Sequence, residues 1–326
     1  MSKYFYPLVE NPYRKKDINQ AIKVLKSCKL SSGNITVNFQ NYFSQKLNSK
    51  NSLMVNSGSS ANLLAFQCLI NPYRKKRLKP GDEVLIPALC WSTSLWPIVQ
   101  SGLKPKFVDV DLDTLNINLN DLDKKISKKT KAIMIVHVLG NCTNMQELIK
   151  IKKKNKLILI EDTCESLGSK YKNKYLGTFG EFSTFSFYSS HQISSGEGGM
   201  ICCKDKNDLE ILKSLRAHGW SRGLKKETEI AKKNKNLDKR FIFYNSGFNL
   251  RPTEVSAAIG LNQFKDLSKF KRARNANRKA FVKILEKNKI LKNLVEVLKP
   301  TKFVNPSWFG MPILLNNKID KKKFIK

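Results

Sequence analysis

Short apolar runs recur along the chain and alternate with stretches of helical periodicity. The runs carry many β-branched residues and little alternation of apolar and polar positions, which is typical of strands buried on both faces of a parallel sheet. Helical patterns between successive runs indicate βαβ units. The sequence therefore predicts an α/β protein whose mostly parallel sheet is covered by helices. The predicted strands cover residues 52–56, 83–87, 106–110, 132–137, 157–160 and 200–203, and a further strand begins at Ser183.

Helical periodicity fills the intervals between these strands. Residues 17–28 form an amphipathic pattern, with Asp17 as the expected N-cap. Residues 225–239 are rich in Lys and predict an exposed loop. The other predicted helices cover residues 39–47, 57–68, 92–102, 119–126, 145–154, 209–215, 252–264 and 264–288.

The last of these helices, over residues 264–288, is long and charged, and we expect it to lead away from the main domain. A strand begins after it, over residues 304–315, and the sequence stops before a second sheet is complete. We therefore expect a large domain of residues 1–263 and an incomplete, smaller C-terminal α/β domain in residues 264–326. A chain of 326 residues can bury the cores of two such unequal domains.

The composition favours a soluble enzyme over a nucleic-acid-binding or membrane protein. The net charge of +34 comes mainly from Lys spread along the whole chain, without the aromatic platforms interleaved with Arg that bind single strands. We interpret it as a basic surface, part of which could steer an anionic substrate. No apolar segment approaches the roughly 20 residues that span a bilayer, and no signal peptide begins the chain. The seven cysteines follow no disulfide pattern, which indicates the cytoplasm.

Three polar features follow predicted strands, at the sheet edge where parallel α/β proteins bind ligands. Residues 57–60 (SGSS) precede a helix and offer an anion site, or simply a helix cap. The 157–160 strand ends in Glu161 and Asp162; a carboxylate there could pair with a protonated ring nitrogen, or serve as a cap or sheet-end ion pair. Trp91 follows the 83–87 strand and could stack on a flat cofactor, or belong to the core.

A fourth feature is the polar loop between the predicted strands that begin at Ser183 and Met200. It contains His191 and closes on the glycine-rich residues 196–199 (GEGG), where positive φ angles cost little. Polar loops between buried strands often carry function. On its own, however, His191 could equally be a solvated loop histidine.

The order of these features resembles the fold-type I pyridoxal-phosphate enzymes, and in particular the sugar aminotransferases and dehydratases of the DegT/DnrJ/EryC1/StrS family. The resemblance covers nearly everything from residue 34 to residue 315. The matching stretches are NSGSSA at 56–61, GDEV at 81–84, FVDVD at 107–111, ED at 161–162, GTFG at 177–180, the loop at 186–199, YNSGFNLR at 244–251 and PSWFG at 306–310.

The resemblance implies a role for each matching position. Asp162 would keep the pyridine nitrogen protonated, which makes the ring an electron sink. Trp91 would stack on the ring, and Glu165 falls where the family usually has Gln or His near the ring hydroxyl. Asn249 would reach the phosphate of the neighbouring subunit's cofactor, so a homodimer with shared active sites is implied. The residues expected to bind the phosphate within one subunit are Ser59, Ser60 and Ser186.

The informative departure from the family is His191, which stands where the aminotransferases have the lysine that bonds covalently to the cofactor. Histidine cannot form that bond, but its imidazole can act as a base near neutral pH. The 3-dehydratases of nucleotide-4-keto-6-deoxysugars share this histidine and use pyridoxamine phosphate. Their CDP-sugar branch also holds a [2Fe–2S] cluster. Only Cys164 matches a ligand of that cluster, so we expect neither a cluster nor another metal. The GDP-sugar branch keeps a second histidine, matched by His218, which we assign to the substrate with little weight.

We therefore expect a 3-dehydratase that removes the C3 oxygen from a nucleotide-4-keto-6-deoxyhexose in the biosynthesis of lipopolysaccharide O-antigen sugars. A GDP-sugar is favoured over a CDP-sugar as the substrate. Pyridoxamine phosphate would supply the amine, His191 would act as base, and glutamate would regenerate the amine form of the cofactor. Two alternatives remain. One is a sugar aminotransferase with a relocated lysine, for which the nearest candidates in sequence are Lys170 to Lys174 and Lys204. The other is a non-catalytic paralogue that binds a sugar nucleotide.

Overall fold

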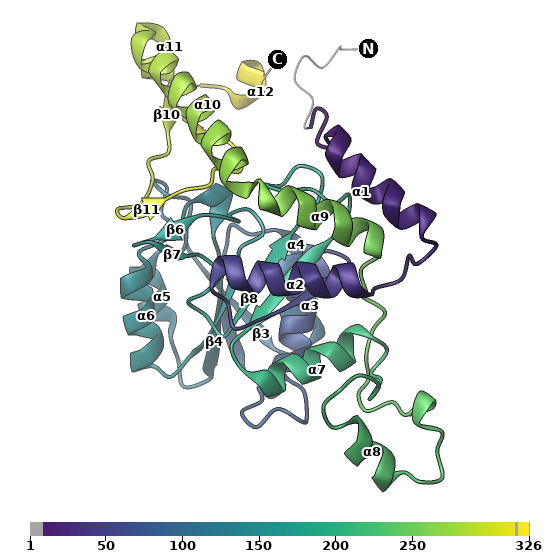
Figure 1. Ribbon diagram of the computed structural model, residues 1–326. Coiled ribbons are helices and arrows are strands. Elements are labelled where there is room, and N and C mark those ends of the chain that lie inside the picture. The colour runs from purple at the N-terminus through teal and green to yellow at the C-terminus, as the bar shows by residue number, and fades with distance from the viewer. Residues whose placement is uncertain (1–8, 317–318, 326) are drawn as a thin grey trace.

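A seven-stranded sheet forms the centre of the protein (Figure 1). The computed structural model describes residues 9–316 and 319–325. The strand order is β1-β9-β8-β5-β4-β2-β3, and only β9 runs against its neighbours. This confirms the predicted α/β fold with a mostly parallel sheet. The strands are β1 Asn51–Val55, β2 Glu83–Pro87, β3 Lys104–Val108, β4 Thr130–Val136, β5 Ile158–Asp162, β8 Phe182–Ser186 and β9 Gly199–Cys203.

Helices cover both faces of this sheet because successive side chains of each buried strand point to opposite faces. On β4, Met134 packs into the core shared with α3 and α7, while Ile133 and Ile135 pack into the core shared with α5 and α6. On β9, Met200 faces a third cluster, formed with α2 and α9. The helices of the main body are α1 Lys15–Lys26, α2 Asn34–Leu47, α3 Gly58–Leu69, α4 Ser92–Gln100, α5 Leu119–Lys125, α6 Met145–Lys154, α7 Lys206–Arg216, α8 Glu227–Lys233 and α9 Glu254–Lys265.

The third cluster is aromatic and joins the N-terminal helices to the strand that enters the polar loop. Phe43 of α2 stacks on Phe264 of α9 with ring centroids 4.7 Å apart, and meets Phe185 of β8 edge-on at 5.0 Å. All three rings are fully buried, so each contributes roughly 2–3 kcal/mol of hydrophobic stabilisation. This packing fixes the position of β8, and therefore the start of the loop that follows it.

Three local predictions were wrong. The strand expected over residues 304–315 is two short strands, Val304–Asn305 and Ile313–Leu315, that pair with different partners. Helix α1 begins at Lys15, and Arg14 rather than Asp17 occupies the N-cap position. Asp17 lies in the first turn, where its carboxylate accepts the backbone N–H of Arg14 at 2.9 Å, and it is fully buried against α9. The Lys-rich stretch 225–239 is exposed as predicted, but it contains helix α8, whose first turn is acidic and whose last turn is basic in agreement with the helix dipole.

The C-terminal part of the chain leaves the main body and then returns to it (Figure 1). Helix α10, Leu267–Lys287, projects away and is followed by α11, Lys289–Leu294. A small sheet joins β10 Val295–Val297 to β12 Ile313–Leu315, and β11 Val304–Asn305 pairs with β6 Lys170–Tyr171 beside β7 Lys174–Tyr175. Helix α12, Lys321–Ile325, follows. The division at residue 264 stays a prediction.

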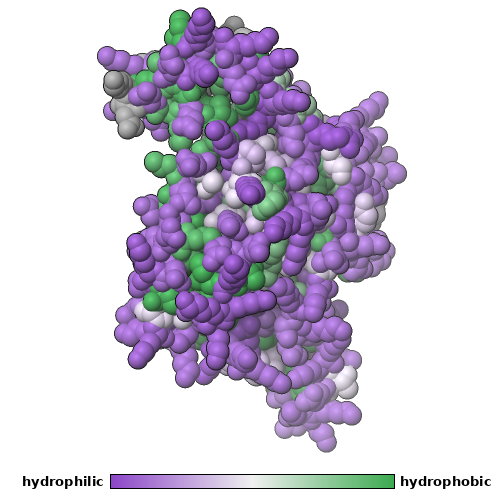
Figure 2. Space-filling model, turned by 90° about the vertical axis from the view of Figure 1, so that its left-hand side faces the viewer, coloured by the Kyte–Doolittle hydropathy of each residue, from purple (hydrophilic) through white to green (hydrophobic). Residues whose placement is uncertain are grey.

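The surface is mostly hydrophilic on the face shown in Figure 2, including the projection at the bottom that corresponds to the α8 region. This agrees with the even spread of Lys along the chain. Within the described parts of the chain, no helix combines the length and the apolar character needed to cross a bilayer.

Candidate active site

Asp162 is the last residue of β5, at the carboxyl edge of the parallel strands, and it is buried. Its Oδ2 accepts hydrogen bonds from Asn62 Nδ2 at 3.0 Å and Ser94 Oγ at 2.7 Å. Its Oδ1 accepts one from the backbone N–H of Cys164 at 3.1 Å. All three donors are neutral, so the carboxylate is held in one orientation without an ion pair at these contacts.

The neighbouring Glu161 is the carboxylate that pairs with a histidine at the end of the sheet. Its carboxylate is fully buried and lies 2.9 Å from Nε2 of His137. It also accepts the backbone N–H groups of Gly177, Phe179 and Gly180 at 2.6–2.8 Å. Burial alone would raise the pKa of Glu161, but these hydrogen bonds and the contact with His137 lower it. Glu161 is therefore structural, and Asp162 faces the candidate site.

The turn at the N-terminus of α3 lies directly against the polar loop. Ser57 caps the helix by accepting the N–H of Ser60 at 3.1 Å. A Cβ on Gly58 would lie 2.6 Å from Cβ of Ser186, so only glycine permits this approach. Ser59 donates to Thr93 Oγ1 at 2.9 Å, which links the turn to α4. The structure thus brings together Ser59, Ser60 and Ser186, the three serines that were predicted to bind a phosphate. The alternative interpretation of this turn as a helix cap also holds, because Ser57 caps α3.

His191 is half-buried, so the alternative of a solvated loop histidine is wrong. Its ring meets Phe309 edge-on at 5.0 Å, and its Nδ1 is buried without a hydrogen-bond partner in the described part of the chain. Burial lowers the pKa of His191 to about 4; the charge of Asp162 opposes this shift and that of Arg274 adds to it. The imidazole is therefore neutral at physiological pH and shares a site with Asp162.

A segment from the C-terminal part of the chain, residues 305–309, forms one wall beside His191. Arg274 of α10 donates to the backbone carbonyls of His191 at 3.1 Å and Phe309 at 2.8 Å, and so ties the loop to this segment. The carbonyl of Ser307 would lie 2.4 Å from a Cβ on Gly140, which has a φ of +95°. The 305–309 segment therefore packs too closely for any side chain at position 140.

Trp91 and Glu165 occupy different environments near Asp162. Trp91 precedes α4 and its side chain is 72% exposed, so the alternative of a core tryptophan is wrong. An exposed indole at this edge is available to stack on a ligand. Glu165 accepts the N–H of Leu139 at 2.8 Å. Burial raises the pKa of Glu165, and the nearby charge of Asp162 raises it further.

Asn249 and His218 lie together in a more exposed cluster. Arg251 donates to Asn249 Oδ1 at 3.2 Å and lies 3.1 Å from Nε2 of His218. The backbone carbonyl of Leu250 accepts the N–H of Asn56 at 3.1 Å, which places this segment beside the end of β1. Within the described residues, no hydrogen bond joins this cluster to Asp162 or His191, and the structure does not bring these two predicted residues into the Asp162 group.

Sequence reasoning missed four residues that organise the site. Asn62, Ser94 and Thr184 form the hydrogen-bonded surroundings of Asp162, and Arg274 holds the carbonyl of His191. An Asn inside an otherwise apolar helix such as α3 was the available signal. The others carry no pattern, because each acts through a contact that is distant in sequence.

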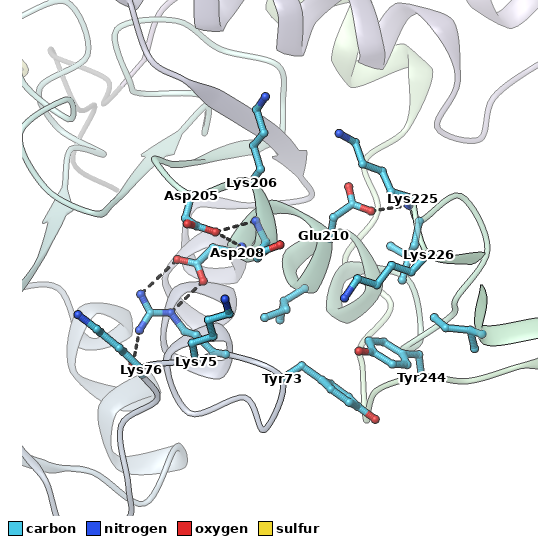
Figure 3. A pocket seen from close by; sticks show the side chains of 15 residues that line it. Tyr73, Lys75, Lys76, Asp205, Lys206, Asp208, Glu210, Lys225, Lys226 and Tyr244 are labelled. Atoms are coloured by element: carbon cyan, nitrogen blue, oxygen red, sulfur yellow. Dashed lines mark hydrogen bonds and ion pairs between the residues drawn. The ribbon is translucent and has the colours of Figure 1, made fainter. Parts of the chain in front are cut away.

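A cavity of ≈ 700 Å³ lies away from this site (Figure 3). Lysines and a stacked pair, Tyr73 and Tyr244, line it, and its acidic residues are engaged, as in the ion pair of Asp208 with Arg74 at 2.9 Å. A smaller cavity of ≈ 360 Å³ adjoins His191 and Arg274. In the residues described by the structure, no group of three or more His, Cys, Asp or Glu side chains could hold a metal ion.

Comparisons with known proteins agree with this geometry. The model of the DegT/DnrJ/EryC1/StrS aminotransferase family matches residues 12–326. The chain is 38% identical to GDP-4-keto-6-deoxy-D-mannose 3-dehydratase of Escherichia coli O55:H7 over 312 residues, which cover 95% of this chain and 79% of that protein. The solved E. coli enzyme with bound hydrated PLP superposes with a TM-score of 0.91 at 37% identity, over 98% of this chain and 82% of the other. A structure of GDP-4-keto-6-deoxymannose 3-dehydratase with a trapped PLP–glutamate geminal diamine gives a TM-score of 0.90 at 36% identity, over 98% and 82%.

Proposed function

The chain belongs to the DegT/DnrJ/EryC1/StrS aminotransferase family, and from this premise we propose that it is a pyridoxamine-phosphate-dependent 3-dehydratase of a nucleotide-4-keto-6-deoxyhexose. The observation that carries the proposal is His191, a neutral, half-buried imidazole in the loop beside Asp162, at the position where the family's aminotransferases have a lysine. The substrate would be a sugar nucleotide for lipopolysaccharide O-antigen, and the reaction would take place in the cytoplasm.

The residues present fit a pyridine cofactor with a phosphate. Asp162 is a buried carboxylate whose Oδ1 accepts one backbone N–H, that of Cys164, so this oxygen can also accept a ring N–H. Trp91 offers an exposed aromatic face at the same edge. The N-terminus of α3, with Ser59 and Ser60, supplies the hydroxyl groups and backbone N–H groups that favour a phosphate, and Ser186 lies against that turn. Nδ1 of His191 is buried and has no hydrogen-bond partner among the described residues, so it is available to a ligand.

When bound, pyridoxamine phosphate would supply an amine for the C4 ketone and a ring that accepts an electron pair as the C3 hydroxyl group departs. Asp162 holds the proton on the ring nitrogen. His191 accepts the proton released from the C4′ carbon of the cofactor, which requires the neutral imidazole that its low pKa provides at pH 7. The 305–309 segment excludes water from one side of His191.

Both alternatives have less support. Lys204 donates its Nζ to the carbonyl of Phe179 at 2.5 Å, and Lys170 and Lys174 lie on the β6–β7 hairpin against aromatic rings. None of these lysines contacts Asp162, so none of them is placed to replace the aminotransferase lysine. A non-catalytic paralogue would not need to retain the full set of contacts around Asp162.

We further propose GDP as the nucleotide, glutamate as the amino donor, and a homodimer. The GDP-sugar is supported by the similarity to GDP-4-keto-6-deoxy-D-mannose 3-dehydratase, and glutamate by the PLP–glutamate adduct in a similar solved structure. A dimer is supported by apolar side chains left exposed near the site, namely Trp91, Trp96, Val99 and Phe107. Asn249 would then meet the cofactor phosphate of the partner subunit, and His218 the substrate.

The test is to incubate the protein with pyridoxamine phosphate, glutamate and GDP-4-keto-6-deoxymannose and to follow the sugar nucleotide by mass spectrometry. Loss of one oxygen from the sugar, abolished by His191→Asn, is the expected result. Gain of nitrogen with the C3 oxygen retained would instead establish an aminotransferase. No change with either the GDP- or the CDP-sugar would leave the non-catalytic paralogue.

A further inference from the structure

Asn62 is a buried polar side chain in the interior of α3, and helix formation does not explain it. It is 2% exposed, with Ala61, Leu64 and Ala65 of the same helix fully buried around it. Asn is less favourable than Ala or Leu inside a helix, and a buried amide costs free energy unless its donors and acceptor are paired. Its partners therefore indicate what it does.

The hydrogen bonds of the Asn62 amide lead toward the candidate site. Its Nδ2 donates to Asp162 Oδ2 at 3.0 Å and to the carbonyl of Thr93 at 3.2 Å. Its Oδ1 accepts the hydroxyl of Thr184 at 2.6 Å. Thr184 lies on β8 and is fully buried. The Asp162 carboxylate and the Thr93 carbonyl are both acceptors, so the amide must turn its Nδ2 toward them, because the flipped amide would set acceptors against each other. The Thr184 hydroxyl, by donating to Oδ1, holds the amide in that orientation.

This arrangement makes the two oxygens of Asp162 unequal. Oδ2 receives two strong side-chain donors, from Asn62 and Ser94, while Oδ1 receives the backbone N–H of Cys164. The thiol of Cys164, a weak donor, also interacts with this carboxylate. A carboxylate oxygen accepts about two hydrogen bonds, so Oδ2 is saturated and Oδ1 has capacity for one more donor. The contacts thus select the oxygen that is left for a ligand.

We propose that Asn62 is a positioning residue for the cofactor, and that the hydrogen-bonded chain from Thr184 through Asn62 presents Oδ1 of Asp162 to a protonated ring nitrogen. The inference rests on the proposed function, since it takes the pyridine ring as the group that Asp162 meets. Asn62 does not touch the reacting atoms; it acts through the orientation of Asp162.

The experiment titrates pyridoxal 5′-phosphate into the purified protein and follows its absorbance across a range of pH. Asn62→Leu removes the donor to Asp162, and Thr184→Val removes only the hydroxyl that orients the amide. Thr184→Ser keeps that hydroxyl. Gln67→Leu is the matched control, because it removes an amide from the same helix whose hydrogen bond goes to Ser101 and not to Asp162.

We expect Asn62→Leu to weaken binding about tenfold, which corresponds to about 1.4 kcal/mol of lost interaction between a less well-placed Asp162 carboxylate and the ring nitrogen. We also expect the bound ring nitrogen to lose its proton at a lower pH, because a less well-placed carboxylate stabilises that proton less. Thr184→Val should shift both quantities in the same direction by a smaller factor, while Thr184→Ser and Gln67→Leu should match the unmodified protein.

A merely structural role for Asn62 would reduce the fraction of folded protein without moving the pH midpoint of the bound cofactor. An unchanged midpoint and affinity in folded Asn62→Leu, or in Thr184→Val if the first variant does not fold, would overturn the inference. Failure of the unmodified protein to bind pyridoxal phosphate would instead overturn the proposed function itself.

Discussion

The buried imidazole of His191 predicts a proton linkage that can be measured without cofactor or substrate. Burial lowers its pKa to about 4 in the folded protein, whereas an unfolded histidine has a pKa of about 6.5. Between these values the unfolded chain binds a proton that the folded chain does not bind, so stability falls as the pH falls from 6.5 toward 4. At pH 5 the loss is about 2 kcal/mol, and at pH 7.5 it is close to zero.

The assay compares the unmodified protein with His191→Asn by urea unfolding at pH 7.5 and pH 5.0. Other titrating groups are present in both proteins, so their contributions cancel in the difference. We expect the unmodified protein to lose about 2 kcal/mol more than the variant on acidification. Proton NMR adds a direct measurement, because the chain has only 3 histidines and the variant identifies the His191 resonance.

Equal pH dependence in the two proteins, together with an NMR midpoint near 6.5, would refute this reasoning. It would mean that water reaches the imidazole freely and that the packing of Phe309 does not bury it. The assignment of His191 as a neutral base prepared by burial would then lose its physical support.

Three further predictions concern the walls of the site. Gly140→Ala should cost about 3 kcal/mol or more in urea unfolding, since its Cβ would collide with a carbonyl at 2.4 Å. Gly102→Ala, with φ of +69° and only ordinary van der Waals contact with Pro80 at 3.6 Å, should cost about 1 kcal/mol, and equal costs would contradict the close approach at Gly140. Glu161→Gln should destabilise the fold by roughly 3–5 kcal/mol, because it breaks a buried pair, and a change below 1 kcal/mol in the same assay would count against that pair. Arg274→Met should raise the pKa of His191, measured by NMR, because the arginine charge lowers it; a fall would contradict the sign.

The sheet was predictable because burial on both faces gives strands a continuous apolar pattern. The range 83–87 agrees with β2 residue for residue, and the helix over 145–154 agrees with α6. The β6–β7 hairpin and β10 escaped prediction because strands of two or three residues have no measurable period.

For the site, the order of the motifs indicated which residues would gather at the sheet edge, and the family resemblance named Asp162 as the carboxylate that would face it. The apolar pattern alone does not separate Asp162 from Glu161; the alternation of the strand sends Glu161 toward His137 and Asp162 toward Asn62. The burial of His191 was not predictable either, since it depends on Phe309, more than a hundred positions later. The roles of the site residues stay predictions until cofactor binding is measured.

The return of the 305–309 segment to the main body has a consequence for biosynthesis. The central sheet is built from residues 51–203, which leave the ribosome well before Phe309. During synthesis, N-terminal units fold first. A nascent chain can therefore assemble its sheet and the Asp162 contacts while His191 still lacks its aromatic neighbour and its link through Arg274. The 305–309 segment can pack beside His191 only near the end of translation. The nascent chain therefore passes through a stage in which the sheet is assembled and His191 is still exposed to solvent.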